Sequence, residues 1–254
     1  MFNTTNIQRA KVQFAEHRYC HVDDILEERY IKELYRSVRE IDYGYWGCAG
    51  HSHQKISQAK MDTLDHDAIR DEYKEEASKQ FGYWHRAKWI HTEQDMVFPL
   101  KFPLSTEFTR VVCEDYSLSK PTPTFHDIVS EITGFTNMET KQPSYSYYGY
   151  DNWLNPHHDP ARWCAYIFYF NPDWKAHWGG QLCIMNEDET TIKDSIEPFG
   201  NRLTIMDVSE TAGKRVNKHF ISPVSYIAPT PRYSLAGWFY PRDTNGELPV
   251  MRDQ

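Results

Sequence analysis

Two residues of metal-binding type, His157 and Asp159, lie two positions apart in the segment NPHHDPARWCAYIFYFN. In an extended chain, residues two apart project to the same side, so this imidazole and this carboxylate face one way and His158 faces another. A third ligand must come from a strand that is distant in the sequence, and His219, in NKHFISPVSYI, is suitably placed. Two imidazoles and one carboxylate on one face of an iron(II) ion leave coordination positions open for a chelating 2-oxo acid and for O2. The three residues therefore predict an iron site that carries out oxygen chemistry.

A basic residue in a later predicted strand could bind the far carboxylate of such an acid. Arg232 opens the segment RYSLAGWFY, directly after the turn at 228–231. A guanidinium group offers paired donors to a carboxylate, and the hydroxyl of Ser234, two residues on, lies on the same face of the strand. Each feature alone has an ordinary alternative, because an HxD pair arises by chance, a strand histidine is often only hydrogen-bonded, and an arginine is often at the surface. Their joint order on a β-rich background favours a metal site with a diacid beside it.

The other candidate motifs carry less information. His51 and His53, in AGHSHQK, form a second pair, but no third ligand is in view, so we interpret them as loop histidines rather than as a metal site. No role is assigned to His85, His91 and His177. The sequence contains no GxxxxGK[ST] loop and no GxGxxG motif, which gives no support to phosphoryl chemistry, and it contains no GxSxG nucleophile elbow.

The second half of the chain predicts the strands that position these residues. From Pro143 onward, short runs rich in Tyr, Ile, Phe, Val and Trp are separated by turn residues. We expect strands near 143–150, 156–160, 163–170, 180–186, 195–199, 202–208, 217–227 and 232–240. This pattern predicts a double-sheet jelly roll or barrel. The run from Trp163 to Phe170 is apolar at every position, which predicts a strand covered on both faces.

The first half predicts helices that pack on one face of the sheet. Apolar residues at steps of three and four predict a helix between Asp23 and Ile41, with Asp23 and Asp24 as its N-terminal caps. Further helices are expected over 65–80, 106–116 and 124–132. The last of these is expected to end at Gly134. The least regular stretch, 43–102, is interpreted as a long loop over the mouth of the barrel, and loops of that length are often functional.

Composition limits the class of protein. The 254 residues, 40% of them hydrophobic, suit one large domain. The five cysteines are scattered and are interpreted as small buried apolar residues rather than as disulfides or zinc ligands. A net charge of −8 without a basic stripe argues against a nucleic-acid partner. Because no apolar run is long enough to span a bilayer or to serve as a signal peptide, we expect no membrane partner and a cytoplasmic location.

Several motifs occur in the order known from one family. They are HxD, an apolar strand ending in Asn, Gly-Gly-x-Leu, the strand NRLTIMDV, HxxxxV and RxSLxGWF. In this order they resemble the prolyl-hydroxylase-type branch of the Fe(II)- and 2-oxoglutarate-dependent oxygenases, and most closely the group that includes the ribosomal-protein prolyl hydroxylases. The resemblance covers about 143–241, and the segment HVDDILEERYIKELY more loosely resembles the N-terminal helix of the family.

The resemblance implies a fold, a set of cofactors and a set of site residues. The fold would be a double-stranded β-helix, or jelly roll, in a single domain over 1–254. In that domain, 1–142 would form helical and irregular support with substrate loops, 143–241 the catalytic core and 242–254 a tail. Fe(II), 2-oxoglutarate and O2 would be required, with ascorbate as a candidate reductant, and succinate and CO2 would be released. The implied iron ligands are His157, Asp159 and His219. The implied groups for the 2-oxoglutarate C5 carboxylate are Arg232 and Ser234, with a cosubstrate contact from Tyr147 or, as second choice, Tyr145.

The substrate is less well defined by the sequence. An amino-acid carbon, in a free amino acid or in a peptide or protein, is the leading candidate for hydroxylation, and another small natural-product metabolite is the alternative. Two further hypotheses from other classes are a non-catalytic jelly-roll module that binds metal and a zinc-type hydrolase. Arg162, Trp178 and Trp238 are candidate substrate contacts, although Arg162 could equally form an ion pair near the metal and the aromatic residues could belong to the core. The oligomeric state is not predicted.

Overall fold

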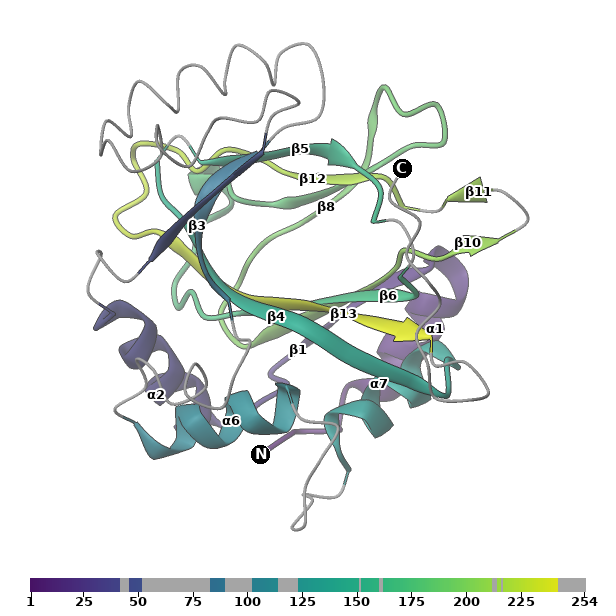
Figure 1. The fold of residues 1–254 in the computed structure, drawn as a ribbon, viewed down its shortest axis with the longest axis horizontal. Coiled ribbons are helices and arrows are strands. Elements are labelled where there is room, and N and C mark those ends of the chain that lie inside the picture. Colours follow the sequence, from purple (N-terminus) through teal and green to yellow (C-terminus); the bar gives the residue numbers. More distant parts are fainter. Residues whose placement is uncertain are drawn as a thin grey trace.

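The computed structural model describes residues 1–41, 46–51, 83–89, 102–113, 123–150, 152–159, 162–211, 214–215 and 217–241 of the chain. Figure 1 shows two facing layers of strands, with the helices on the outer side of the layer that contains β4, β6 and β13. The helices are α1 (Ile7–His17), α2 (Glu28–Arg39), α6 (Pro103–Cys113), α7 (Phe125–Thr133) and the short 3-10 helix η2 (Ala176–Trp178).

The strands form one continuous antiparallel path that curls into a barrel. Their bounds are β1 (Tyr19–Asp23), β2 (Gly47–His51), β3 (Tyr83–Trp89), β4 (Met138–Tyr148), β5 (Trp153–His157), β6 (Cys164–Tyr169), β7 (Leu182–Met185), β8 (Ile192–Ile196), β9 (Arg202–Asp207), β10 (Glu210–Thr211), β11 (Lys214–Arg215), β12 (His219–Ile221) and β13 (Arg232–Pro241). The order is β1-β9-β6-β13-β4-β3-β5-β12-β7-β8, with β2 paired to β3 and with β10 and β11 as a separate hairpin.

This topology is a jelly roll, as the sequence predicts. One layer is β9-β6-β13-β4 and the other is β5-β12-β7-β8, so strands that are distant in the sequence alternate within each layer. Strand β3 pairs with β4 in one layer and with β5 in the other. The two layers are therefore joined by backbone hydrogen bonds on that side of the barrel.

Strand β6 is covered on both faces, which confirms the interpretation of its apolar run. Cys164 and Phe168 belong to the core between the sheet and the helices. Ala165 and Ile167 point the other way and pack inside the barrel with residues of β7, β9 and β12. Because neighbouring residues of a strand face opposite sides, a strand buried on both faces must be apolar at every position.

Helix α7, which precedes β4, agrees with its prediction. Thr124 caps α7 by accepting a hydrogen bond from the backbone N–H of Asp127, and the Asp127 carboxylate accepts one from the backbone of Thr124. Gly134 ends the helix in the left-handed conformation at φ 76°, which glycine adopts without strain. The capping residues thus fix both ends of the helix through local chemistry alone.

The N-terminal region contains two elements that the sequence analysis does not predict, helix α1 and strand β1. Asp23 does not cap a helix but ends strand β1, and its carboxylate accepts two hydrogen bonds from Arg202 of β9, at 2.6 and 3.1 Å. Helix α2 begins at Glu28. Two tertiary interactions outweigh the preference of aspartate for a helix cap. They are the ion pair of Asp23 with Arg202 and the backbone pairing of β1 along β9. The expected helix at 65–80, and most of 43–102, lie outside the described residues.

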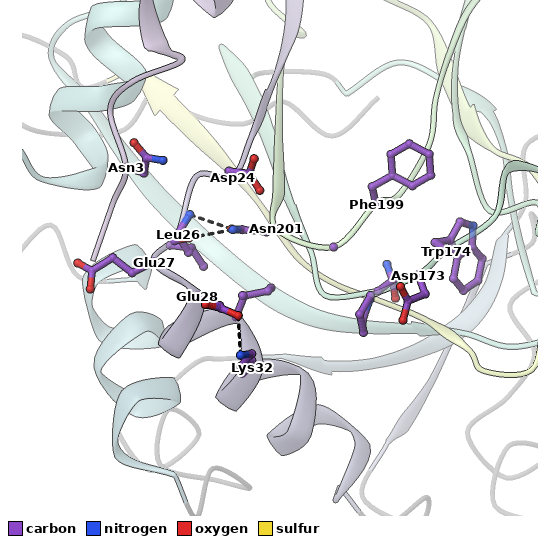
Figure 2. Close-up of a pocket in the computed structure, with 14 residues that line it drawn as sticks. Asn3, Asp24, Leu26, Glu27, Glu28, Lys32, Asp173, Trp174, Phe199 and Asn201 are labelled. Atoms are coloured by element: carbon purple, nitrogen blue, oxygen red, sulfur yellow. Dashed lines mark hydrogen bonds and ion pairs between the residues drawn. The ribbon is translucent and has the colours of Figure 1, made fainter.

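The chain between β1 and α2 is fastened to the turn that precedes β9. The Asn201 side chain accepts a hydrogen bond from the backbone N–H of Leu26 at 2.8 Å and donates one to the Leu26 carbonyl at 2.8 Å, as the dashed lines in Figure 2 show. The surface hollow around this joint has a volume of about 860 Å³, with Phe199 and Trp174 on its far side.

Among the described residues, none of the helices combines the length and apolar character needed to cross a membrane.

Asn171, two residues after the end of β6, connects β6 to β13 through its side chain. Its buried side chain donates to the carbonyls of Pro198 and Tyr233 at 2.9 and 3.0 Å and accepts from the Tyr233 N–H at 2.6 Å. We expect Asn171→Ala to lower the free energy of unfolding by about 1–3 kcal/mol, because buried backbone groups lose their partners.

Urea unfolding followed by circular dichroism would measure this loss. The matched control is Asn186→Ala in the β7–β8 turn, where the side chain makes only an exposed hydrogen bond to Thr191, and we expect a change within about 0.5 kcal/mol there. Equal losses in the two variants would contradict a special role for Asn171.

Candidate active site

The structure brings together the three residues that the sequence selects as metal ligands. His157 ends β5, His219 begins β12, and the two residues lie opposite each other in an antiparallel pair. The Asp159 carboxylate lies 3.7 Å from Nε2 of each histidine. The candidate ligand atoms of all three side chains lie within 4.8 Å of one another. This spacing is suitable for one metal ion bound by two imidazoles and a carboxylate.

The two imidazole rings are oriented by the same local device. Nδ1 of His157 lies 2.9 Å from the carbonyl oxygen of Asn155, and Nδ1 of His219 lies 2.9 Å from that of Asn217. A carbonyl can only accept a hydrogen bond, so Nδ1 carries the proton in both rings and the lone pair is on Nε2. Burial lowers the pKa of His219 to about 4. The ring is therefore neutral at pH 7, as a metal ligand must be.

The carboxylate of Asp159 is held by two donors. Nη1 of Arg162 donates to Oδ1 at 3.0 Å, and the indole N–H of Trp238 donates to Oδ2 at 2.8 Å. Burial by itself would raise the pKa of this carboxyl, but the neighbouring basic groups, which are the two imidazoles and the Arg162 guanidinium, outweigh it together with the Trp238 hydrogen bond and leave the pKa below its usual value. Asp159 is therefore ionised and directed at the histidines.

These three residues lie in the wall of a cavity of about 340 Å³. Its walls are partly apolar, with contributions from Ile167, Leu182, Met206 and Ile221. Arg232 and Ser234 lie in the same wall. A molecule in the cavity would therefore meet a metal-binding group and a cation in apolar surroundings, where electrostatic interactions are stronger than in water.

Arg232 is fully buried, at 0% exposure, and is only partly satisfied. Nη1 donates to the Ser234 hydroxyl at 3.2 Å. Nε and Nη2 have no hydrogen-bond partner among the residues that the structure describes. The guanidinium carbon lies 4.9 Å from the ring centre of Tyr148 and 5.0 Å from that of Tyr169. Because a buried cation with unpaired donors is costly, the arrangement fits an incoming carboxylate that accepts two parallel hydrogen bonds.

Gly180 makes room for this arginine. A Cβ atom at this position would come within 2.9 Å of Cδ of Arg232, and the backbone φ of 72° disfavours any other residue. The Gly-Gly-x-Leu motif of the sequence thus has a steric explanation at its second glycine.

The tyrosines that the resemblance selects as cosubstrate contacts lie on the wrong face of β4. The Tyr145 hydroxyl is 2.6 Å from that of Thr109 in α6, and Tyr147 packs against Trp46 outside the barrel. Tyr148, the next residue, lines the cavity instead. A shift of one residue turns every side chain of a strand to the other face, and the run Tyr-Ser-Tyr-Tyr does not reveal which tyrosine faces inward.

The candidate substrate contacts have three different positions. Arg162 is engaged by Asp159 and stacks over Trp238, with its guanidinium carbon 4.3 Å from the ring centre. Trp238 lines the cavity. Trp178 packs edge-on against Trp174 at 5.4 Å and is not among the described residues that line the cavity, so its role as a substrate contact stays a prediction.

Sequence reasoning missed three residues of the site, which are Tyr148, Tyr169 and His85. Tyr148 and Tyr169 were within predicted strands, and the correct register would have revealed them. His85 lies on β3, in the stretch interpreted as a long loop, and no motif distinguished it from the other unassigned histidines.

The comparisons with known proteins agree with this geometry. Residues 143–240 match the family model described as the 2OG-Fe(II) oxygenase superfamily. This match supports a dioxygenase-class enzyme that uses Fe(II), 2-oxoglutarate and O2. The group of two histidines and an aspartate described above lies within the matched segment. No curated protein sequence matches the chain.

Solved structures support the fold. A prolyl-4-hydroxylase from Pseudomonas putida is similar with a TM-score of 0.56 and 14% identity, over 93% of this chain and 100% of that one. A prolyl hydroxylase from Trichoplax adhaerens, in complex with a hypoxia-inducible-factor peptide fragment, has a TM-score of 0.56 and 16% identity, over 93% and 91%. The 2-oxoglutarate-dependent epimerase SnoN from nogalamycin biosynthesis has a TM-score of 0.54 and 10% identity, over 99% and 93%.

The hydrogen bond from Trp238 to Asp159 provides a test of the metal site. We expect Trp238→Phe to weaken Fe(II) binding about tenfold or more, because groups that orient a ligand typically contribute that much to metal affinity. Anaerobic calorimetric titration with Fe(II) would measure the change. Trp178→Phe, outside the cavity, is the matched control and should bind the metal like the unaltered protein. Unchanged affinity in Trp238→Phe would show that the indole does not position the carboxylate.

Proposed function

We propose that His157, Asp159 and His219 hold the Fe(II) ion of this dioxygenase and that Arg232, with Ser234, binds the C5 carboxylate of 2-oxoglutarate. One observation carries the proposal. A buried arginine with two unpaired nitrogens and a group of two histidines and one aspartate share a single cavity of about 340 Å³. A molecule with a carboxylate at one end and a metal-chelating group at the other would satisfy both sites.

The reaction would combine a C–H substrate, 2-oxoglutarate and O2 to give the hydroxylated product, succinate and CO2. The bound iron and cosubstrate supply the O2 chemistry. The residues of the chain supply geometry and polarity. The two Nε2 atoms and the Asp159 carboxylate fix one side of the metal, and Arg232 sets the direction in which the cosubstrate lies. The apolar wall excludes water from the remaining space.

The domain organisation follows from the same arrangement. We propose a single oxygenase domain over 1–254, with the catalytic core in 143–241. The outer helices support this core, because Tyr145, Phe168 and Phe239 of the barrel pack in the same hydrophobic core as α1, α2, α6 and α7.

The proposed substrate is an amino-acid carbon, in a free amino acid or within a peptide or protein. Support comes from the likeness in fold to prolyl hydroxylases, one of which was solved with a peptide fragment. The similarity to SnoN, an epimerase of nogalamycin biosynthesis, favours the second candidate, a small natural-product metabolite. Mass-spectrometric screening for products heavier by one oxygen atom, across free amino acids and peptides, would distinguish the two.

Two other classes of function account less well for Arg232. A jelly-roll module that binds metal without catalysis needs no buried cation beside the metal ligands. A zinc hydrolase would use the same three ligands with a bound water, but its turnover would not require O2. The unpaired guanidinium therefore favours the oxygenase.

We expect the protein to form succinate from 2-oxoglutarate only when Fe(II), O2 and a mixture of free amino acids and peptides are present. In Arg232→Gln, the KM for 2-oxoglutarate should rise about tenfold to a hundredfold, because charge-assisted hydrogen bonds to the carboxylate are lost. Coupled measurement of succinate would follow both.

The matched control is Arg202→Gln on β9. Arg202 is also buried, but its guanidinium is paired with Asp23, so the substitution should lower stability and leave the KM unchanged. Product formation without O2, or an unchanged KM in Arg232→Gln, would contradict the proposed function.

A further inference from the structure

Four side chains form a continuous stack across the inner face of the sheet. Tyr169, Arg232, Tyr148 and His85 come from β6, β13, β4 and β3, which are neighbours in that order. The guanidinium of Arg232 lies between the rings of Tyr169 and Tyr148, at 5.0 and 4.9 Å. The imidazole of His85 stacks on Tyr148 with ring centres 4.6 Å apart and planes 8° from parallel. Arg232 and His85 approach Tyr148 from opposite sides, because β4 lies between β13 and β3.

We propose that His85 is a positioning residue for the cosubstrate, which acts by fixing the ring of Tyr148 against which Arg232 packs. The inference rests on the proposed function, because it concerns the site of the 2-oxoglutarate C5 carboxylate. It adds a residue from outside the segment 143–240 that matches the family model.

The contacts of Arg232 show why its direction depends on the stack. Within the described part of the chain, Nη1 donates to the Ser234 hydroxyl, and neither Nε nor Nη2 has a hydrogen-bond partner. The rings of Tyr148 and Tyr169, at 4.9 and 5.0 Å, therefore supply much of the contact that holds the guanidinium in place. A cation fixed in the direction of its ligand loses less entropy on binding than a mobile one.

His85 contacts Tyr148 through the face of its ring and not through its polar atoms. Nδ1 of His85 is buried, and none of the described residues forms a hydrogen bond with it. Burial, with the charge of Arg232, lowers the pKa of His85 to about 3, so the ring adds no second positive charge to the site at neutral pH. A flat neutral ring of similar size should therefore replace it.

The position of β3 gives the contact its rigidity. Strand β3 pairs with β4 through the register Arg86 with Tyr147 and with β5 through Tyr83 with Leu154. The backbone of His85 is thus held between the two layers of the barrel, and in Figure 1 β3 crosses from one layer to the other. Strand β3 thus becomes part of the cosubstrate site.

The test is a calorimetric titration of 2-oxoglutarate into the full-length protein, loaded anaerobically with Mn(II). We expect His85→Ala to raise the Kd about threefold to tenfold, the range for one lost aromatic contact. In His85→Phe, which keeps a flat ring, the Kd should stay within about twofold of that of the unaltered protein. The temperature of unfolding would be recorded for every variant.

The matched control is His126→Ala. The ring of His126, on helix α7, packs edge-on against Phe239 at 4.8 Å and is not among the described residues that line the cavity, so its loss should lower the unfolding temperature and leave the Kd unchanged. The inference is overturned if His85→Ala lowers only the unfolding temperature, or if His85→Phe weakens binding as much as His85→Ala. Failure of the unaltered protein to bind 2-oxoglutarate would instead overturn the proposed function, and Arg232→Gln provides the reference for lost binding.

Discussion

The antiparallel pairing of β5 with β12 is the constraint on which the candidate site depends. It places His157 opposite His219 although these residues are far apart in the sequence, and the alternation of side chains then directs Asp159 to the same side as His157. The same closed barrel brings β13 beside β4, so that Arg232 lies opposite Tyr148. Without this register, the three candidate ligands and the cation would belong to separate surfaces.

Charge is arranged along the cavity in a consistent way. Asp159 is ionised and His219 is neutral, and both lie beside His157, so this end has an affinity for a metal cation. The other end has an unpaired guanidinium and an affinity for an anion. A dicarboxylate that chelates a divalent metal would balance both charges, and this complementarity is the physical basis for the proposed cosubstrate site. The apolar wall between the two ends strengthens both interactions.

The sequence revealed those parts of the site that follow from strand periodicity. His157, Asp159, Arg232 and Ser234 each depend on residues two apart facing one way, and the structure brings them into one cavity. The local sequence does not distinguish Tyr147 from Tyr148, because the register of β4 comes from tertiary pairing with β13 and β3. His85 and the β1 strand depend on contacts between distant segments, and no local pattern encodes such contacts.

Anaerobic absorption spectroscopy of the Fe(II)-loaded protein tests the central claim most directly. Chelation of Fe(II) by the carboxylate and keto oxygen of a 2-oxo acid produces a visible charge-transfer absorption. The account predicts that this absorption increases with added 2-oxoglutarate until one molecule is bound per protein. Glutarate, which lacks the keto oxygen, should produce no such absorption. The substitution His219→Ala should abolish it. Binding of 2-oxoglutarate without any change in the absorption of the metal would contradict the account.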